Sequence, residues 1–290
     1  MHTRLLLLTA LAALFLASPL KAQAVYEAPH FPSPRVPEQI GFAGQTYHFD
    51  RPDLYDSMHR ELIAFTYGHT LSTLMLRRSE RIFSQVVPIL KKNGIPEDLK
   101  YLMAIESNLD PKAISVAGAG GLWQFMKTTG RGYGLEVNDE VDERFHLAKA
   151  TEAACRYLKD AFAKYGDWMT VAASYNAGQG GISGRLSAQQ QTSALDLLLP
   201  EETSRYMFRV LTAKYFFEQP EKFGYQAESE REYPYKAPRK TVEVKGPVPS
   251  LADFAKEHGT SFYLLREANP WLRSDKLTNK SGKTYRIVIP

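Results

Sequence analysis

Apolar residues recur at intervals of three and four through most of the chain between Leu54 and Phe217. This spacing is typical of amphipathic helices. The segments that carry it are 58–76, 82–90, 99–105, 150–162, 170–175 and 206–217. Glycine-rich stretches, rather than β-branched runs, separate these segments. The pattern therefore predicts an all-α domain over residues 54–217.

The last fifty residues follow a different pattern. Two alternating segments, typical of strands, flank two short segments with helical spacing. In chain order the four segments are 241–244, 251–258, 262–268 and 284–289. We therefore expect a fold that is mainly α, in which the helical domain is followed by a small α+β (βααβ) module at 241–290.

Two segments lack any period. Residues 218–240 mix Pro, Glu, Lys and Tyr, and they indicate a linker between the two folded parts. Residues 25–53 hold four prolines in their first half and indicate an extended, Pro-rich lead-in to the helical domain.

The first 24 residues indicate export. Arg4 precedes an apolar run, Leu5–Leu16, and Ala22-Gln23-Ala24 follows it. A basic start, a short apolar core and an A-x-A end are typical of a secretory signal peptide over residues 1–24. The alternative is an uncleaved anchor, although the run is shorter than the ~20 residues that a spanning helix needs. We expect an exported protein of the periplasm or cell envelope, and peripheral attachment to the envelope stays open.

Charge and cysteine content narrow the function classes. The formal charge of +4 falls to +2 when residues 1–24 are removed, because Arg4 and Lys21 leave and no acid does. This is too weak to indicate nucleic acid as a partner. Cys155 is the only cysteine, so an intramolecular disulfide is excluded, and its helical context indicates a small buried residue.

Glu106 interrupts an apolar stripe. Leu99, Leu102 and Met103 precede it by seven, four and three residues, so the four positions share one helix face. The helix should end soon afterwards, because Asp110 precedes a proline. A carboxyl at the end of a buried stripe is partly desolvated, which raises its pKa and suits it to donate a proton. The alternative is a glutamate that accepts backbone N–H bonds at the helix end.

The loop after this helix has features of a ligand site. Gly118, Gly120 and Gly121 permit close backbone approach, and Trp123-Gln124-Phe125 supply an apolar plate beside an amide. The alternative is a tight turn with Trp123 in the core.

The acidic run 139–143 indicates a solvated turn.

Other chemistries lack support in the sequence. The glycine runs at 130–134 and 178–181 follow no strand and carry no P-loop Lys-Ser/Thr. His, Cys and Asp residues show no metal-ligand spacing, and no G-x-S-x-G motif is present. We therefore expect no metal and no cofactor, and acid–base chemistry on a neutral polymer is the favoured class.

Four blocks in order resemble one family. They are Glu106-Ser107, Gly120-Gly121-Leu122-Trp123-Gln124-Phe125-Met126, Ser174-Tyr175-Asn176-Ala177-Gly178 and Leu199-Pro200-Glu201-Glu202-Thr203-Ser204-Arg205-Tyr206. Over about residues 78–217 the chain resembles the lysozyme-like (goose-lysozyme-type) lytic transglycosylases, above all the membrane-bound lytic murein transglycosylase D type. One departure is Ser174, where many relatives carry Ala.

The resemblance implies cleavage of the β-1,4 bond between N-acetylmuramic acid and N-acetylglucosamine in peptidoglycan glycan strands. Most glycosidases use two carboxylates, whereas this family is similar to the substrate-assisted exceptions. One glutamate, which corresponds to Glu106, acts as acid and then as base, and the product is a 1,6-anhydro sugar.

The resemblance also implies substrate-binding residues. Ser107 would bond near the reacting sugar, and Gln124 would contact an N-acetyl or hydroxyl group, with Phe125 and Met126 beside it. Tyr175 and Asn176 would line the cleft, and Tyr206 would approach Glu106 from the last helix. Glu202 corresponds to a cleft or structural residue rather than to a second catalyst.

The C-terminal module resembles a LysM domain, a family that binds N-acetylglucosamine-containing glycans. Residues 250–272, with Asn269-Pro270, are similar to its two helices, and 283–290 to its closing strand. The usual Gly-Asp-Thr-Leu opening is replaced by Gly246-Pro247-Val248-Pro249-Ser250-Leu251. The module is therefore either a glycan-binding domain or one that only packs on the catalytic domain.

Two other functions stay open at this stage. A goose-type lysozyme would use water and need a second carboxylate, for which Asp110 and Asp142 have no supporting pattern. A catalytically silent peptidoglycan-binding protein would have no need of the Glu106 and Tyr175-Asn176 blocks.

Overall fold

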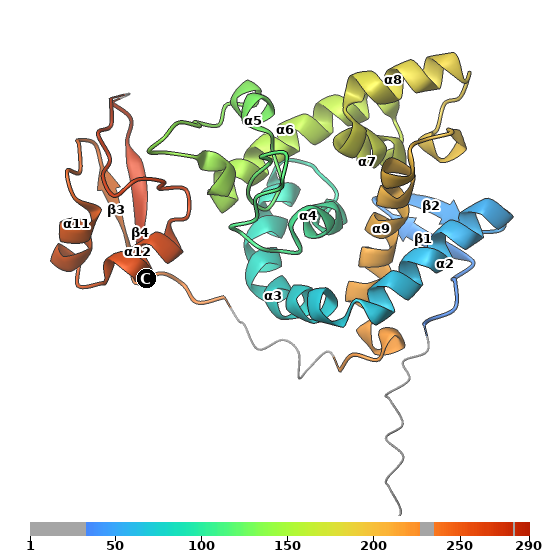
Figure 1. Ribbon diagram of the computed structural model, residues 1–290, viewed down its shortest axis with the longest axis horizontal. Helices are drawn as coiled ribbons and strands as arrows, with labels where there is room; N and C mark the ends of the chain where they lie inside the picture. Colours follow the sequence, from blue (N-terminus) through green and yellow to red (C-terminus); the bar gives the residue numbers. More distant parts are fainter. Residues whose placement is uncertain (1–32, 227–234, 281) are drawn as a thin grey trace, which may run out of the picture. The chain divides into compact units, whose positions relative to one another are not determined.

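The computed structural model describes residues 33–226, 235–280 and 282–290. Residues 33–226 are mainly helical, and a small module of two strands and two helices occupies 240–290 (Figure 1). This confirms the fold class predicted from the sequence. The expected signal peptide lies outside the described residues.

Helices make up most of the first part (Figure 1). They are α2 (Pro52–Tyr67), α3 (His69–Lys92), α4 (Leu99–Ser107), α5 (Lys127–Gly132), α6 (Leu147–Tyr165), α7 (Trp168–Ala177), α8 (Gln179–Ala188) and α9 (Glu201–Glu218). Short 3-10 turns lie at η1 (Glu143–Phe145), η2 (Ala194–Asp196) and η3 (Pro220–Phe223).

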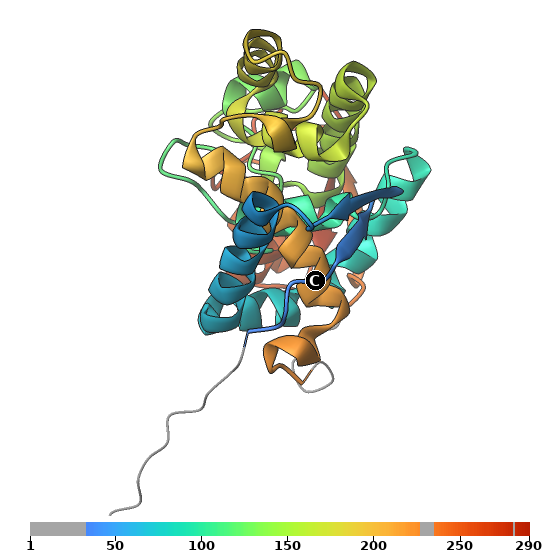
Figure 2. The ribbon, with the colours of Figure 1, turned by 90° about the vertical axis from the view of Figure 1, so that its right-hand side faces the viewer.

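Helix α9 is the centre of the helical part. It contacts α2, α4, α7 and β1, and Figure 2 shows it passing between the surrounding helices. It buries side chains on several faces, among them Tyr206, Val210 and Phe216. A helix with apolar residues on several faces is stable only when other elements cover it. Side chains from α9 can therefore reach the end of α4.

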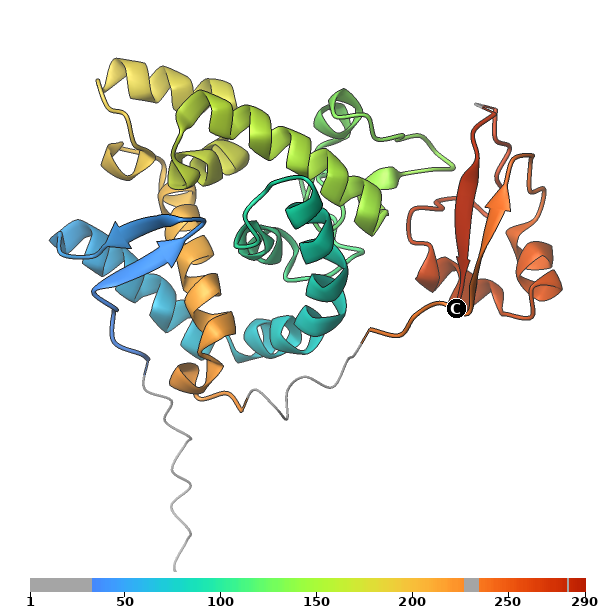
Figure 3. The same cartoon turned by 180° about the vertical axis from the view of Figure 1, so that it is seen from behind.

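A β-hairpin precedes the helices, where the sequence indicated an extended lead-in. Strand β1 (Gln39–Phe42) pairs antiparallel with β2 (Gln45–His48), and Ala43 and Gly44 turn between them with positive φ. Alternate side chains Ile40, Phe42 and Tyr47 are buried in the helical core, and the hairpin lies beside α9 (Figure 3). Residues 39–48 are thus part of the helical domain's core, and the expected lead-in does not extend through them.

The expected linker also begins later than predicted. After α9 the turn η3 brings Phe223 and Tyr225 into the helical core, where both rings pack edge-on against Phe216. Aromatic pairs in this arrangement stabilise beyond the area that they bury. Residues 220–225 therefore close the helical domain.

The C-terminal module has the predicted order of elements. Strand β3 (Lys240–Val244) pairs antiparallel with β4 (Tyr285–Ile289), and helices α11 (Leu251–Glu257) and α12 (Phe262–Ala268) lie between them in the chain. Ser250 and Ser261 cap the two helices by accepting the N–H of Asp253 and Leu264. Side-chain caps of this kind stabilise short helices that could not form alone.

The acidic run expected to be a solvated turn joins the two parts instead. Val141 and Phe145 belong to the same apolar cluster as the core of the module. The Asp142 N–H donates to the Trp271 carbonyl at 2.8 Å, and the Arg273 N–H donates to the Glu140 carbonyl at 2.8 Å. The run is therefore partly buried because its backbone pairs with a segment far away in the sequence.

None of the described helices combines the length and the apolar character needed to cross a membrane.

Replacing Phe42 tests whether the hairpin belongs to the core. Phe42 is 1% exposed, so Phe42→Ala should lower the free energy of unfolding by about 3–5 kcal/mol through lost burial and a cavity. Leu198→Ala is the control, because Leu198 is 85% exposed and should change it by less than about 0.5 kcal/mol. Denaturant unfolding measures both variants, and equal effects would contradict the placement of the hairpin.

Candidate active site

Glu106 lies where the sequence placed it, at the end of a buried stripe on α4. Leu99, Leu102 and Met103 are fully buried. Glu106, one turn further on the same face, keeps part of its surface exposed. The helix face therefore changes from apolar packing to solvent access at this residue.

Helix α4 ends at Ser107, one residue after Glu106. Asn108 and Leu109 both adopt positive φ, 50° and 55°, which ends the helix. Leu109 is fully buried, and Arg78 donates to the Asn108 carbonyl at 3.1 Å. These two contacts hold the strained exit in place and fix the position of the Glu106 backbone.

Burial raises the pKa of the Glu106 carboxyl to about 7, from an ordinary value of 4.5. Loss of hydration is the main cause, since it disfavours the charged form. A hydrogen bond from Tyr206 and the charge of Arg209 act in the opposite direction, and the charge of Glu202 acts with burial. A carboxyl with this pKa is about half protonated at neutral pH, as a proton donor and acceptor needs to be.

Tyr206 contacts Glu106 directly. Its hydroxyl donates to Glu106 Oε1 at 2.6 Å from α9, a helix about a hundred residues further along the chain. Tyr206 is 4% exposed, and burial and the Glu106 charge hold its pKa well above the ordinary range. The phenol therefore stays protonated and can hold the carboxylate in one orientation through every protonation change of Glu106.

Tyr175, on α7, connects Glu106 with the glycine-rich loop. The charge of Glu106 raises the pKa of Tyr175, although burial is the larger cause. The Tyr175 hydroxyl donates to the Trp123 carbonyl at 2.6 Å, and its ring packs edge-on against Tyr157 at 5.0 Å. Asn176, the next residue, is partly exposed near the end of the helix.

The glycine-rich loop closes on itself through short bridges. Gly120 pairs with both Ile114 and Phe125. At Gly121 φ is +76°, and a Cβ there would lie 1.9 Å from the Arg144 carbonyl oxygen. No other residue fits this position, since any side chain would displace the backbone beneath it. The glycine therefore brings the loop against residue 144.

Arg144 holds this loop in place through hydrogen bonds to its backbone carbonyls. It is 4% exposed and forms an ion pair with Asp142, Nη2 to Oδ2, at 2.7 Å. Its Nη1 donates to the carbonyls of Gly118 at 2.8 Å and Phe125 at 2.9 Å. The sequence did not reveal this role. The fixed guanidinium fork matches several acceptors at once, which suits Arg to such a clamp.

Two loop residues, Trp123 and Phe125, differ from the expected apolar plate. Trp123 is fully buried and donates its indole N–H to Thr151 Oγ1 at 3.0 Å. It is a core residue, the alternative considered from the sequence. Phe125 is 3% exposed and offers almost no surface, whereas Met126 is 43% exposed.

The side chains of Gln124 and Ser107 already form hydrogen bonds within the protein. Gln124 donates from Nε2 to the carbonyls of Ala113, at 3.1 Å, and Gly121, at 2.7 Å. Ser107 is 4% exposed, and its hydroxyl donates to the Met103 carbonyl at 3.2 Å. For a ligand, both therefore offer acceptor oxygens rather than donors.

The structure thus brings Glu106, Tyr206 and Tyr175 together and leaves Ser107 and Gln124 as supports of the backbone. Arg209 also acts on Glu106, and its place one turn after Tyr206 was the available sequence signal. Asp142, a candidate for the second carboxylate of a hydrolase, forms an ion pair with Arg144 instead. Among the residues that the structure describes, no cluster of three or more His, Cys, Asp or Glu side chains could hold a metal ion.

Comparisons with known proteins find two matching family models and several relatives. Residues 88–197 match the family model described as "Transglycosylase SLT domain", and residues 240–290 match "Soluble lytic transglycosylase C-terminal LysM-like domain". The chain is 29% identical over 218 residues to membrane-bound lytic murein transglycosylase D of Escherichia coli K12, which covers 73% of this chain and 47% of that protein. This chain thus spans about half the length of that relative.

Two further similarities are shorter. The chain is 33% identical over 122 residues to peptidoglycan transglycosylase gp16 of Escherichia phage T7, covering 41% of this chain and 9% of that protein. Among solved structures, the soluble lytic transglycosylase SLT70 of Escherichia coli is 20% identical, with a TM-score of 0.42, and the match covers 52% of this chain and 26% of that one.

The raised pKa of Glu106 predicts a pH-dependent stability difference for Glu106→Gln. Because the folded-state pKa of about 7 exceeds the ordinary 4.5, the folded protein binds more protons than the unfolded chain between these values, so stability falls as pH rises. The variant should match wild type below pH 4.5 and exceed it above pH 7, by roughly 1–3 kcal/mol.

Urea unfolding across this pH range measures the difference. Glu257→Gln, at an exposed position, serves as the control and should follow wild type at every pH. If Glu106→Gln lost stability at high pH, the carboxylate would be held by structural partners, contrary to the desolvation argument.

Proposed function

We propose that the protein cleaves peptidoglycan glycan strands as a lytic transglycosylase, a function supported by the match of residues 88–197 to the transglycosylase SLT domain model. The observation that supports this most strongly is the Glu106 carboxyl, which has a pKa near neutrality and lies beside a protonated tyrosine. The bond cut would be the β-1,4 linkage from N-acetylmuramic acid to N-acetylglucosamine.

In the first step the protonated Glu106 donates its proton to the glycosidic oxygen. The bond between that oxygen and C1 of the muramic acid breaks, and the N-acetyl group of the same sugar supports the cationic carbon. Tyr206 remains hydrogen-bonded to the new carboxylate and so lowers the cost of the charge in a desolvated place. A charge-assisted bond of this kind is stronger than one between neutral groups.

In the second step the Glu106 carboxylate accepts the proton of the 6-hydroxyl of the muramic acid. That oxygen attacks C1, a 1,6-anhydro ring forms, and Glu106 returns to its protonated state. No water is consumed, and one carboxyl group serves as acid and then as base. This requirement agrees with a pKa near the working pH.

The remaining site residues have supporting roles in this proposal. Tyr175 and Asn176 would contact the sugar from α7, and Gln124 and Ser107 would accept hydrogen bonds from it. Phe125 would act through its packing against Tyr175, whose ring centroid lies 6.3 Å away, and Met126 would offer an exposed apolar contact.

The location and the second module follow from the same proposal. A chain that acts on peptidoglycan would be exported to the periplasm or cell envelope, which agrees with the signal peptide expected at residues 1–24. The LysM-like module at 241–290 would bind the glycan as well as pack on residues 141–145. The backbone bonds between the two parts support the packing role.

Analysis of the products distinguishes this function from its rivals. Wild type should release muropeptides from purified sacculi that are lighter by one water than hydrolysed ones, and Glu106→Gln should release none. Glu202→Gln is the control, because Glu202 acts on Glu106 only through its charge and should leave the product type unchanged. Mass spectrometry identifies the products.

Each other outcome identifies a different function. Reducing ends would make the protein a lysozyme-type hydrolase with a second carboxylate. Binding of sacculi without release would make it a catalytically silent peptidoglycan-binding protein.

A further inference from the structure

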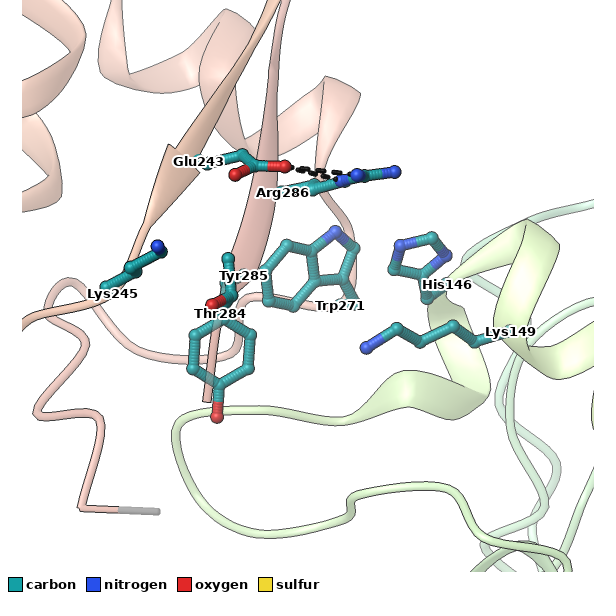
Figure 4. A pocket seen from close by; sticks show the side chains of 8 residues that line it. All are labelled: His146, Lys149, Glu243, Lys245, Trp271, Thr284, Tyr285 and Arg286. Atoms are coloured by element: carbon teal, nitrogen blue, oxygen red, sulfur yellow. Dashed lines mark hydrogen bonds and ion pairs between the residues drawn. The ribbon is translucent and has the colours of Figure 1, made fainter. Parts of the chain in front are cut away.

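A second pocket lies away from Glu106, where the beginning of α6 approaches the C-terminal module. Figure 4 shows Lys149 and His146 from the α6 side, Lys245 from the β3 side, and Trp271 between them. The cavity has a volume of about 580 Å³, within the range of small-ligand sites. Thr284, Tyr285 and the pair of Glu243 and Arg286 complete its lining.

The walls of this pocket are fixed. The Asp142 N–H donates to the Trp271 carbonyl, and Trp271 is 4% exposed and stacked on Tyr285 with ring centroids 5.8 Å apart. The His146 ring lies 5.6 Å from Trp271. Rigid walls lower the entropic cost of holding a ligand.

Positive charge exceeds negative charge in the lining. Lys149, Lys245 and Arg286 carry three cations, and Glu243 carries the one carboxylate. Arg286 forms an ion pair with Glu243 at 3.0 Å. Lys149 forms an ion pair with the buried Glu143, which does not line the pocket. Across the residues described here, the Lys245 ammonium has no ion-pair or hydrogen-bond partner. The pocket therefore attracts an anion, and Lys245 is the group most available to it.

The aromatic wall adds a second requirement. Burial and Lys149 lower the pKa of His146 to about 4, so its ring is neutral at neutral pH and extends the wall begun by Trp271. A ligand that matches both features has carboxylate groups on a body with small apolar groups. The peptide stems of peptidoglycan have this chemistry, since they combine free carboxylates with alanine methyl groups.

We propose that this pocket binds a carboxylate-bearing peptide stem of the peptidoglycan strand, a proposal that rests on the function proposed above. The site lies on the face of the β3–β4 pair that carries Glu243, Lys245 and Arg286. Its wall residue His146 follows Arg144 by two positions, so the stem would contact the segment that holds the glycine-rich loop.

Charge reversal at Lys245 tests the proposal in the full chain. All proteins carry Glu106→Gln so that the probe is not cleaved, and the probe is a soluble disaccharide–tetrapeptide from peptidoglycan. Lys245→Glu should weaken its binding about tenfold, because an attraction becomes a repulsion at the pocket. The matched control is Lys256→Glu, at another exposed lysine on α11, which should bind as the parent does.

A second probe and a second variant complete the experiment. The same disaccharide without its peptide should bind equally to both lysine variants in calorimetry. The probe with its peptide should change the tryptophan fluorescence of the parent, and Trp271→Phe should remove that change. The proposal would be overturned if Lys245→Glu and Lys256→Glu bound the peptide-bearing probe with equal affinity. It would also be overturned if Lys245→Glu weakened binding of the peptide-free probe as much as binding of the peptide-bearing probe.

Failure here is distinguishable from failure of the proposed function. The pocket is tested by ligand binding in proteins that carry Glu106→Gln. The proposed function is tested by the type of product that wild type releases. Anhydro products with no effect of Lys245→Glu would leave the function standing and remove the pocket.

Discussion

The site depends on one desolvated carboxyl group with one strong hydrogen bond. Burial at the end of the α4 stripe favours the neutral form of Glu106, and the 2.6 Å bond from Tyr206 favours the charged form. The balance leaves the pKa at about 7. Neither effect alone would serve, since burial without Tyr206 would hold the proton too tightly, and a solvated carboxyl would have lost it. Two helices far apart in sequence must therefore meet, and the central position of α9 makes this contact.

The surrounding structure supports that contact through the backbone rather than through a wall of exposed aromatics. Tyr175 fixes the Trp123 carbonyl, and Arg144 fixes the carbonyls of Gly118 and Phe125. Gly121 allows the loop to lie directly against residue 144. The same segment, 140–145, pairs with the C-terminal module. The module is thus continuous with the elements that shape the glycine-rich loop, and the further pocket is formed where they meet.

Local spacing was sufficient to predict the helical character of residues 54–217, the βααβ order and the raised pKa of Glu106, because these depend on neighbours within one element. It did not predict α5 or α8, and it did not show the break between α2 and α3. Local spacing failed where the burial of a residue depends on segments far away in the sequence. The hairpin at residues 39–48 reads as a lead-in until the helical core that covers Ile40 and Phe42 is known. Asp142 reads as solvated because its burial comes from residues 271–273. The sequence is equally consistent with Trp123 as a ligand-binding surface and as a core residue, because it does not show which side of a loop faces the core.

Titration of the Glu106 carboxyl tests the account most directly. The full chain would be labelled with ¹³C at glutamate carboxyls, and the Glu106 signal would be assigned by its absence in Glu106→Gln. The account predicts a midpoint at about pH 7. A midpoint near the ordinary 4.5 would mean that Glu106 is charged at neutral pH, and the single-carboxyl mechanism would then lose its proton donor.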